Sequence, residues 1–250
     1  MRRVEFFTIR PPAINYLQFM VLALRSPLVR IATTGHAVQT TTGALSAVKG
    51  VTINAISYGN YGLYSTQAIS SSTGNIVVTG ISFANRGISQ DGTTTASTGN
   101  VTLNGTTTNQ YGVYTSALIT ANNITVTGTA STAVAGWVVQ VNAMTINSGS
   151  TGGDITITAT GAAAGGGNGL YQSGAITGAN GSDITFTSNN SISQNGAITL
   201  AANTSGNTAA LTYDATSGNR LSTILSGALT LTAGSSSDIN FVMKSAGSAI

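Results

Sequence analysis

The sequence lacks several residue types on which most enzyme sites depend. It contains no cysteine, one histidine (His36) and six acidic residues among 250. The absence of cysteine excludes a thiol nucleophile, a cysteine-based zinc site and a disulfide framework. A two-histidine metal site is excluded as well, and no Gly-x-Ser-x-Gly elbow accompanies His36 for a serine-hydrolase triad. We interpret His36 as a surface or turn residue and predict a protein that is not an enzyme, with no catalytic residue, cofactor or metal site.

Charge is equally scarce. Charged residues make up 6% of the chain, against about 25% in a typical globular protein. Thr (40), Gly (31), Ser (28) and Asn (21) together form almost half of the sequence. Intrinsic disorder couples low hydrophobicity to high net charge, whereas this chain is 41% hydrophobic. The composition therefore indicates a folded protein whose surface is covered by hydroxyl and amide groups.

The net charge of +3 does not indicate a nucleic-acid partner. Five of the nine basic residues fall within the first thirty positions, and from residue 31 onward there are four basic and five acidic residues. Nucleic-acid binding needs clustered Lys and Arg that follow the phosphates. We therefore predict no nucleic-acid partner.

Residues 1–34 form a separate basic and apolar segment. Its apolar run, residues 13–24, is too short for a membrane span, which needs about 20 residues, so no transmembrane segment is predicted. The run has the length of a signal-peptide hydrophobic region behind a basic start, although Pro11, Pro12 and Arg25 are poor signal features. Three interpretations stay open: a degenerate export signal, an irregular or capping segment, and a misassigned start.

The sequence from residue 35 to residue 250 is repetitive. A Gly-apolar start recurs in Tyr-Gly-Leu-Tyr (61–64), Tyr-Gly-Val-Tyr (111–114) and Asn-Gly-Leu-Tyr (168–171). Gly87-Ile-Ser and Gly136-Trp-Val fall near the midpoints, so the period is about 25 residues. A second unit, in which apolar residues alternate with Thr, occurs in nine copies: 75–80, 100–105, 123–128, 143–147, 154–158, 183–187, 197–200, 228–232 and 238–242.

The alternation has a period of two residues, which predicts short strands with one buried and one wet face. Thr, Val and Ile favour such strands, and no helical periodicity interrupts them. Short strands repeated at this period are typical of a parallel β-helix, in which stacked turns bury a continuous apolar column. We predict an all-β parallel β-helix (β-solenoid) over residues 35–250, with turns of about 20–30 residues and an irregular N-terminal segment.

Asn or Asp precedes six of these strands, at Asn75, Asn100, Asn123, Asp154, Asp183 and Asp238. Paired catalytic carboxylates must converge about 5–10 Å apart at a cleft. A turn residue needs only the repeat, because a short polar side chain there can bond a neighbouring backbone amide. We interpret the three acids as turn residues.

The segments 74–80, 99–105 and 122–128, with the Gly-Ala-Ile-Thr-Leu and Gly-Ala-Leu-Thr-Leu strands at 196–200 and 227–231, resemble the β-helical repeats of filamentous-haemagglutinin-like adhesins and autotransporter passenger domains. The resemblance implies a secreted or cell-surface protein, associated with the bacterial outer membrane, with structural or adhesive roles. Its implied partners are host or environmental surface ligands, carbohydrate among them, and further repeats of the same chain. Because the chain stops soon after a strand, we expect it to be part of a longer array.

Two other functions stay open. Thr-x-Thr pairs at 125/127, 156/158, 185/187 and 230/232 resemble the flat hydroxyl arrays of β-helical antifreeze proteins. A β-helical carbohydrate-active enzyme would use acids with Lys or Arg, for which Arg86 with Asp91 and Asp214 with Arg220 are the most suggestive neighbours.

Aromatic residues cluster at the Gly-apolar starts. Tyr64 and Tyr114 are expected two turns apart with Ser89 between them. Packing inward or at a corner is the default for such residues, whereas exposed rings could stack on sugars. The candidate ligand-binding residues are Tyr64, Tyr114, Tyr171 and Trp137.

Overall fold

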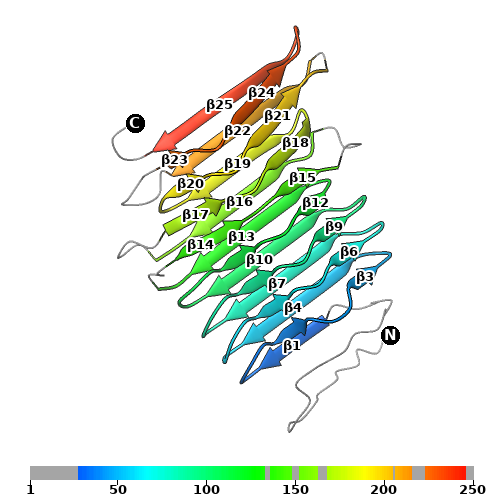
Figure 1. The fold of residues 1–250 in the computed structure, drawn as a ribbon, viewed down its shortest axis with the longest axis vertical. Coiled ribbons are helices and arrows are strands. Elements are labelled where there is room, and N and C mark those ends of the chain that lie inside the picture. Colours follow the sequence, from blue (N-terminus) through cyan, green and yellow to red (C-terminus); the bar gives the residue numbers. More distant parts are fainter. Residues whose placement is uncertain are drawn as a thin grey trace, which may run out of the picture.

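The computed structural model describes residues 28–132, 136–147, 152–162, 168–204, 206–215 and 223–245. Within these ranges the chain forms 25 strands in three parallel sheets and no helix. Neighbours within each sheet are three strands apart in the chain, so the chain winds through the sheets in turn (Figure 1). This confirms the predicted all-β parallel β-solenoid.

Sheet A contains nine strands that come from the longer copies of the repeat. They are β1 (Leu28–Ala32), β4 (Val51–Ser57), β7 (Ile76–Ser82), β10 (Val101–Thr107), β13 (Ile124–Ala130), β16 (Ile155–Thr160), β19 (Asp183–Ser188), β22 (Thr208–Ala215) and β25 (Asp238–Ser245). Residues 28–32, which the sequence placed in the N-terminal segment, therefore form the first strand of sheet A, and residues 1–27 lie outside the described ranges.

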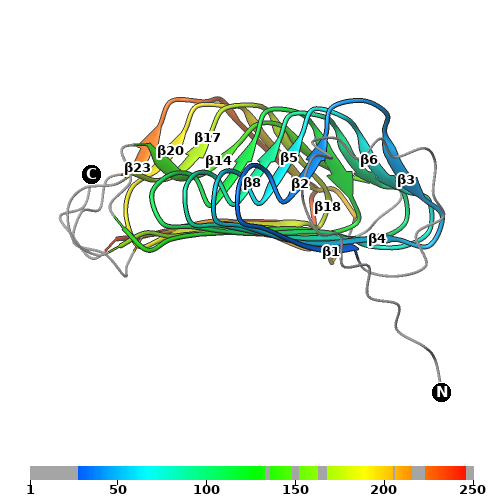
Figure 2. The same cartoon turned by 90° about the horizontal axis from the view of Figure 1, so that it is seen from below.

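Sheets B and C contain eight shorter strands each. Sheet B comprises β2 (Val38–Thr40), β5 (Leu63–Ser65), β8 (Ile88–Gln90), β11 (Val113–Thr115), β14 (Trp137–Val141), β17 (Asn168–Gln172), β20 (Ile192–Gln194) and β23 (Thr223–Leu225). Sheet C comprises β3 (Leu45–Ala47), β6 (Ile69–Ser71), β9 (Thr94–Ala96), β12 (Ile119–Ala121), β15 (Met144–Ile146), β18 (Ile176–Asn180), β21 (Ile198–Ala202) and β24 (Leu229–Ala233). Sheet A forms one flat side of the rod, and sheets B and C lie opposite it (Figure 2).

The register confirms the predicted period. Val51, Ile76 and Val101 are aligned in sheet A and are 25 residues apart in sequence. Later turns differ in length, from 23 residues between Val101 and Ile124 to 31 residues between Ile124 and Ile155. The strands stay aligned because the connections absorb the extra residues.

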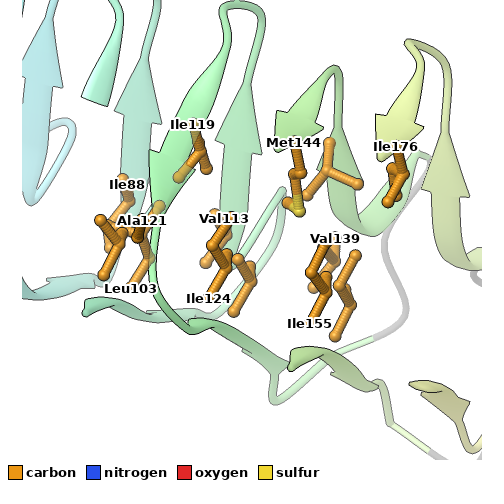
Figure 3. Close-up of a cluster of buried hydrophobic side chains, with 14 of the residues drawn as sticks. Ile88, Leu103, Val113, Ile119, Ala121, Ile124, Val139, Met144, Ile155 and Ile176 are labelled. Atoms are coloured by element: carbon orange, nitrogen blue, oxygen red, sulfur yellow. The ribbon is translucent and has the colours of Figure 1, made fainter. Parts of the chain in front are cut away.

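The core is a set of apolar columns to which all three sheets contribute (Figure 3). Ile88, Val113 and Val139 form a column in sheet B, while Ile119, Met144 and Ile176 form one in sheet C. All six are at most 1% exposed. Burying a side chain of this size contributes about 1.5–3 kcal/mol relative to leaving it exposed, so the columns supply the main driving force for stacking.

The A–B corner explains the Gly-apolar start. Gly62, Gly87 and Gly112 lie opposite the column Gly80, Gly105 and Gly128, and the two backbones approach closely. A Cβ on Gly105 would lie 1.9 Å from the carbonyl oxygen of Gly112, and one on Gly87 would lie 2.6 Å from the amide nitrogen of Thr106. Only glycine fits at Gly105 and Gly87, because real Cβ atoms do not approach a backbone atom so closely, whereas Ala55 and Ala159 occupy the Gly105 column at other turns.

Hydroxyl groups close the same corner. Ser57, Ser82 and Thr107 are aligned in sheet A, and each hydroxyl donates to a backbone carbonyl of the preceding turn, as Ser57 does to Gly35 at 2.6 Å. Each hydroxyl also accepts from a backbone amide, such as that of Asn60 at 2.9 Å from Ser57 Oγ. Buried backbone groups are thereby satisfied without charged side chains.

The B–C corner has the most uniform connections. Its turns contain two to four residues, whereas the C–A turns contain two to eight and the A–B turns three to seven. Buried glutamines stabilise the B–C corner: Gln90 Nε2 donates to the carbonyls of Gly92 at 2.8 Å and Gln67 at 3.0 Å, and Gln194 repeats the contact with Gly196.

Two details of the predicted repeat were wrong. The nine alternating copies belong to two sheets, since 143–147, 197–200 and 228–232 contribute to sheet C and the other six to sheet A. Gly136-Trp-Val does not align with the other Gly-apolar starts, because Val139, not Trp137, pairs with Val113. Strands of both sheets have the same local pattern, so the sequence alone could not separate them.

Candidate ligand-binding face

The outer surface of sheet B carries two columns of large polar and aromatic side chains. The first column occupies the position two residues before Val38, Leu63, Ile88, Val113 and Val139, which are aligned in the sheet. The second column occupies the position directly after these five residues and continues to Tyr171 in β17. We define the aromatic face as the eight half-buried ring and guanidinium residues of these columns: His36, Tyr61, Tyr64, Arg86, Tyr111, Tyr114, Trp137 and Tyr171.

The local sequence explains how both columns reach the same surface. Tyr61 and Tyr64 lie on either side of Gly62, which turns the chain at the A–B corner, and Leu63 points into the core at 0% exposure. The two tyrosine rings therefore meet outside the sheet, with centroids 5.4 Å apart. Tyr111 and Tyr114 repeat the arrangement with an edge contact at 5.6 Å.

At the N-terminal part of the face, His36 is stacked on tyrosine rings. Its ring lies 4.9 Å from that of Tyr61, with an angle of 2° between the planes, and 5.2 Å from that of Tyr64. Burial lowers the pKa of His36 from its ordinary value. The lowered pKa favours the neutral imidazole, which stacks well on aromatic rings.

Arg86 lies between tyrosine rings near the middle of the face. Its guanidinium carbon is 4.2 Å from the ring centroid of Tyr114, 4.9 Å from that of Tyr111 and 5.8 Å from that of Tyr61. Nη1 donates to the hydroxyl of Ser89 at 3.1 Å, and Ser89 is only 1% exposed although it points outward. The rings hold the guanidinium in one place through cation–π contacts.

Trp137 and Tyr171 form a second ring pair further along the rod. Their centroids are 5.2 Å apart, with an angle of 22° between the planes. The hydroxyl of Tyr171 accepts a hydrogen bond from Asn195 Nδ2 at 3.2 Å. This pair extends the aromatic face toward β20.

All four predicted ligand-binding residues lie on this face. Tyr64 and Tyr114 are aligned through Ser89, as predicted, and Tyr114 aligns with Tyr171 through Gln140. Their rings are half-buried on the outer surface of sheet B, and Trp137 occupies the column beside the A–B corner. His36, Tyr61, Arg86 and Tyr111 were not among the predicted ligand-binding residues. For Tyr61, Arg86 and Tyr111 the signal in the sequence is a spacing of three residues across a corner glycine, whereas His36 is followed by Ala37.

The outer surface of sheet A is a hydroxyl array. Thr125, Thr156 and Thr185 are aligned, with Thr127, Thr158 and Thr187 beside them. The first column extends to Thr102 and Thr212. Three of the four predicted Thr-x-Thr pairs therefore share one surface, whereas Thr230 and Thr232 lie in sheet C.

The Asn and Asp positions form a hydrogen-bond ladder along sheet A. The amide of Asn100 donates to Asn75 Oδ1 at 2.9 Å, that of Asp154 to Asn123 Oδ1 at 2.9 Å, and that of Asp183 to Asp154 Oδ1 at 3.0 Å. The predicted bond to a neighbouring amide is confirmed for these positions. Partial desolvation raises the pKa of Asp183, and the nearby Asp154 adds to this increase.

Asp238 does not belong to this ladder. Asp183 pairs with Ala210, and Ala210 pairs with Asn240, so Asp238 lies two residues earlier in the register. The shared Asp-Ile-x-Phe pattern of 183–186 and 238–241 had indicated the wrong alignment. The three acids are therefore not equivalent positions.

The suggested acid–base neighbours are separated by their elements. Arg86 precedes β8 and Asp91 follows it, and Asp91 Oδ1 accepts from the Ser116 hydroxyl at 2.7 Å. Asp214 forms an ion pair with Lys244 at 3.5 Å on sheet A. Arg220 lies outside the described residues. Over the ranges that the structure covers, no three His, Cys, Asp or Glu side chains gather as a metal site.

Across the described part of the chain, no helix has the length and hydrophobicity needed to cross a membrane. No protein-family model, no curated protein and no solved structure matches the chain.

Proposed function

We propose that this chain is a non-enzymatic β-solenoid segment of a secreted or surface-displayed bacterial adhesin, and that it binds surface polysaccharide through the aromatic face. The observation that carries the proposal is the continuous outward alignment of ring and guanidinium side chains on sheet B. The rings lie outside a sheet whose inner residues, such as Leu63 and Val113, already fill the core, so their edges and hydroxyl groups face a ligand.

The stacking defines how a ligand would make contact. One face of the Tyr61 ring is covered by His36, and Arg86 lies over Tyr111 and Tyr114. A sugar ring therefore meets ring edges, the remaining free ring faces and phenol hydroxyl groups. Neighbouring positions in a column are about 4.8 Å apart, so the face suits an extended polymer that lies along the rod.

The test uses the full chain and three immobilised polysaccharides: hyaluronan, carboxyl-reduced hyaluronan and dextran. We expect binding to at least one of them. The double variant Tyr64→Ala/Tyr114→Ala should weaken that affinity at least about tenfold, because alanine removes the large aromatic contact area of both rings.

The matched control is Thr156→Ala/Thr185→Ala, which changes the outer surface of sheet A and should leave the affinity unchanged. Circular dichroism and the melting temperature report whether each variant folds. No binding by the folded wild type to any of the three polymers, or equal binding by the tyrosine variant, would contradict the proposal.

Ice binding is a second candidate, favoured by the alignment of the Thr array. Five consecutive threonines (102, 125, 156, 185 and 212) form one column despite unequal spacing in the sequence. Positions along a strand and between strands are about 6.7 Å and 4.8 Å apart, which makes a flat hydroxyl grid.

Thermal hysteresis of the purified chain tests this candidate. If the array binds ice, Thr156→Tyr should abolish the hysteresis because the ring projects from the grid, whereas Thr120→Tyr on the outer surface of sheet C should not. No hysteresis in the wild type ends the candidate.

A further inference from the structure

The guanidinium of Arg86 has the features of an anion-binding group. Among the residues that the structure describes, no carboxylate forms an ion pair with it, and Ser89 is its hydrogen-bond acceptor. The nearest acid in sequence, Asp91, is bonded to the Ser116 hydroxyl beyond the far end of β8. Arg86 therefore presents a positive charge that the described part of the molecule does not neutralise.

Its surroundings also supply hydrogen-bond donors. The hydroxyls of Tyr61, Tyr64, Tyr111 and Tyr114 make no hydrogen bond within the described ranges and are not buried. His36 is kept neutral by burial and adds no second charge. One fixed cation surrounded by free hydroxyls complements a ligand that combines many hydroxyls with a sparse negative charge.

We propose, as an extension of the polysaccharide-binding function above on which it rests, that Arg86 binds the carboxylate of an acidic polysaccharide lying along the aromatic face. The planar guanidinium offers two parallel N–H groups that match a carboxylate. The rings of Tyr111 and Tyr114 hold it in position, so little conformational freedom is lost on binding. A densely charged polyanion is poorly matched, because Arg86 is the one Lys or Arg of the aromatic face.

Hyaluronan tests the inference, since carboxyl reduction removes its charge and leaves the polymer backbone. We expect wild type to bind hyaluronan at least about tenfold more tightly than the reduced polymer, which is the usual contribution of a charge-assisted hydrogen bond. Arg86→Gln should remove this preference, and Arg86→Lys should retain only part of it. Lys49→Gln, which removes a basic residue outside the aromatic face, is the matched control and should behave as wild type.

The outcomes separate the two proposals. Equal affinity of wild type for hyaluronan and its reduced form, with binding still lost in the tyrosine variant, overturns the role of Arg86 and keeps the polysaccharide function. No binding to hyaluronan, its reduced form or dextran overturns both. If the chain binds chondroitin sulfate and carboxyl-reduced chondroitin sulfate equally well, the recognised group is sulfate. That result overturns the assignment of a carboxylate. An unchanged preference in folded Arg86→Gln likewise contradicts the inference.

Discussion

Tyr213 shows what the solenoid interior requires of a single residue. It lies in β22 at 0% exposure, with its ring 5.1 Å from that of Phe186 at 11° and 6.0 Å from that of Phe241. Its hydroxyl has no hydrogen-bond partner among the described residues. Burial raises the pKa of Tyr213, because the phenolate cannot be solvated inside the rod. The ring suits the core, whereas the hydroxyl does not.

We therefore expect Tyr213→Phe to raise the free energy of unfolding by about 1 kcal/mol, since a buried unsatisfied hydroxyl costs about 1–3 kcal/mol. Because the folded pKa is raised, the wild type loses stability as the pH rises above the ordinary tyrosine value of 10.0. The advantage of the variant should therefore grow above that pH. Urea titrations at neutral and alkaline pH measure both effects. If Tyr213→Phe is less stable than wild type at neutral pH, the buried hydroxyl does not destabilise the fold and the prediction is wrong.

At the level of elements, the A–B corner shows that two glycines can be needed for different reasons. Gly105 has no room for a side chain, since a Cβ would lie 1.9 Å from the carbonyl oxygen of Gly112. Gly35 has open space around it and a φ of 72°, which L residues other than Asn and Asp rarely adopt. The first position is limited by packing and the second by backbone conformation.

This difference predicts opposite responses to asparagine. Gly105→Ala should lower the free energy of unfolding by about 1–3 kcal/mol through overpacking, and Gly105→Asn should cost more. Gly35→Ala should cost about 1–2 kcal/mol, and Gly35→Asn should restore much of the loss. Thermal or urea unfolding measures the free energy of unfolding of the four variants and of the wild type. The two causes are assigned wrongly if Gly105→Asn is more stable than Gly105→Ala, or if Gly35→Asn is no more stable than Gly35→Ala.

Much of the element pattern could be predicted because strand alternation and the period are local. The spacing of Tyr64, Ser89 and Tyr114 gave their correct alignment, and the Asn and Asp positions gave most of the ladder. Sheet membership could not be predicted, since 197–200 in sheet C has the same alternation as 183–187 in sheet A. The position of Arg86 among the rings was missed because it replaces a tyrosine in its column, and only the three-dimensional register places it between Tyr61 and Tyr111.

For the whole molecule, the scarcity of charge follows from how the turns are joined. Backbone bonds between parallel strands and the hydroxyl and amide ladders satisfy most of the polar groups, while apolar columns fill the interior. In the described ranges, a single ion pair joins Lys244 to Asp214, and an exposed pair contributes about 0–1 kcal/mol. Asp91 and Asp154 accept hydrogen bonds within the solenoid, whereas Arg86 has no acidic partner among the described residues and is available for the contact proposed above.

The unequal turn lengths have a further consequence for how such a chain can change. Because the B–C turns stay at two to four residues while both edges of sheet A accept longer connections, insertions at those edges leave every strand in place. Loop closure becomes only slowly more costly as a loop lengthens. The two edges of sheet A are therefore where new segments can be added during evolution or by design, while the aromatic face and the Thr array keep their spacing.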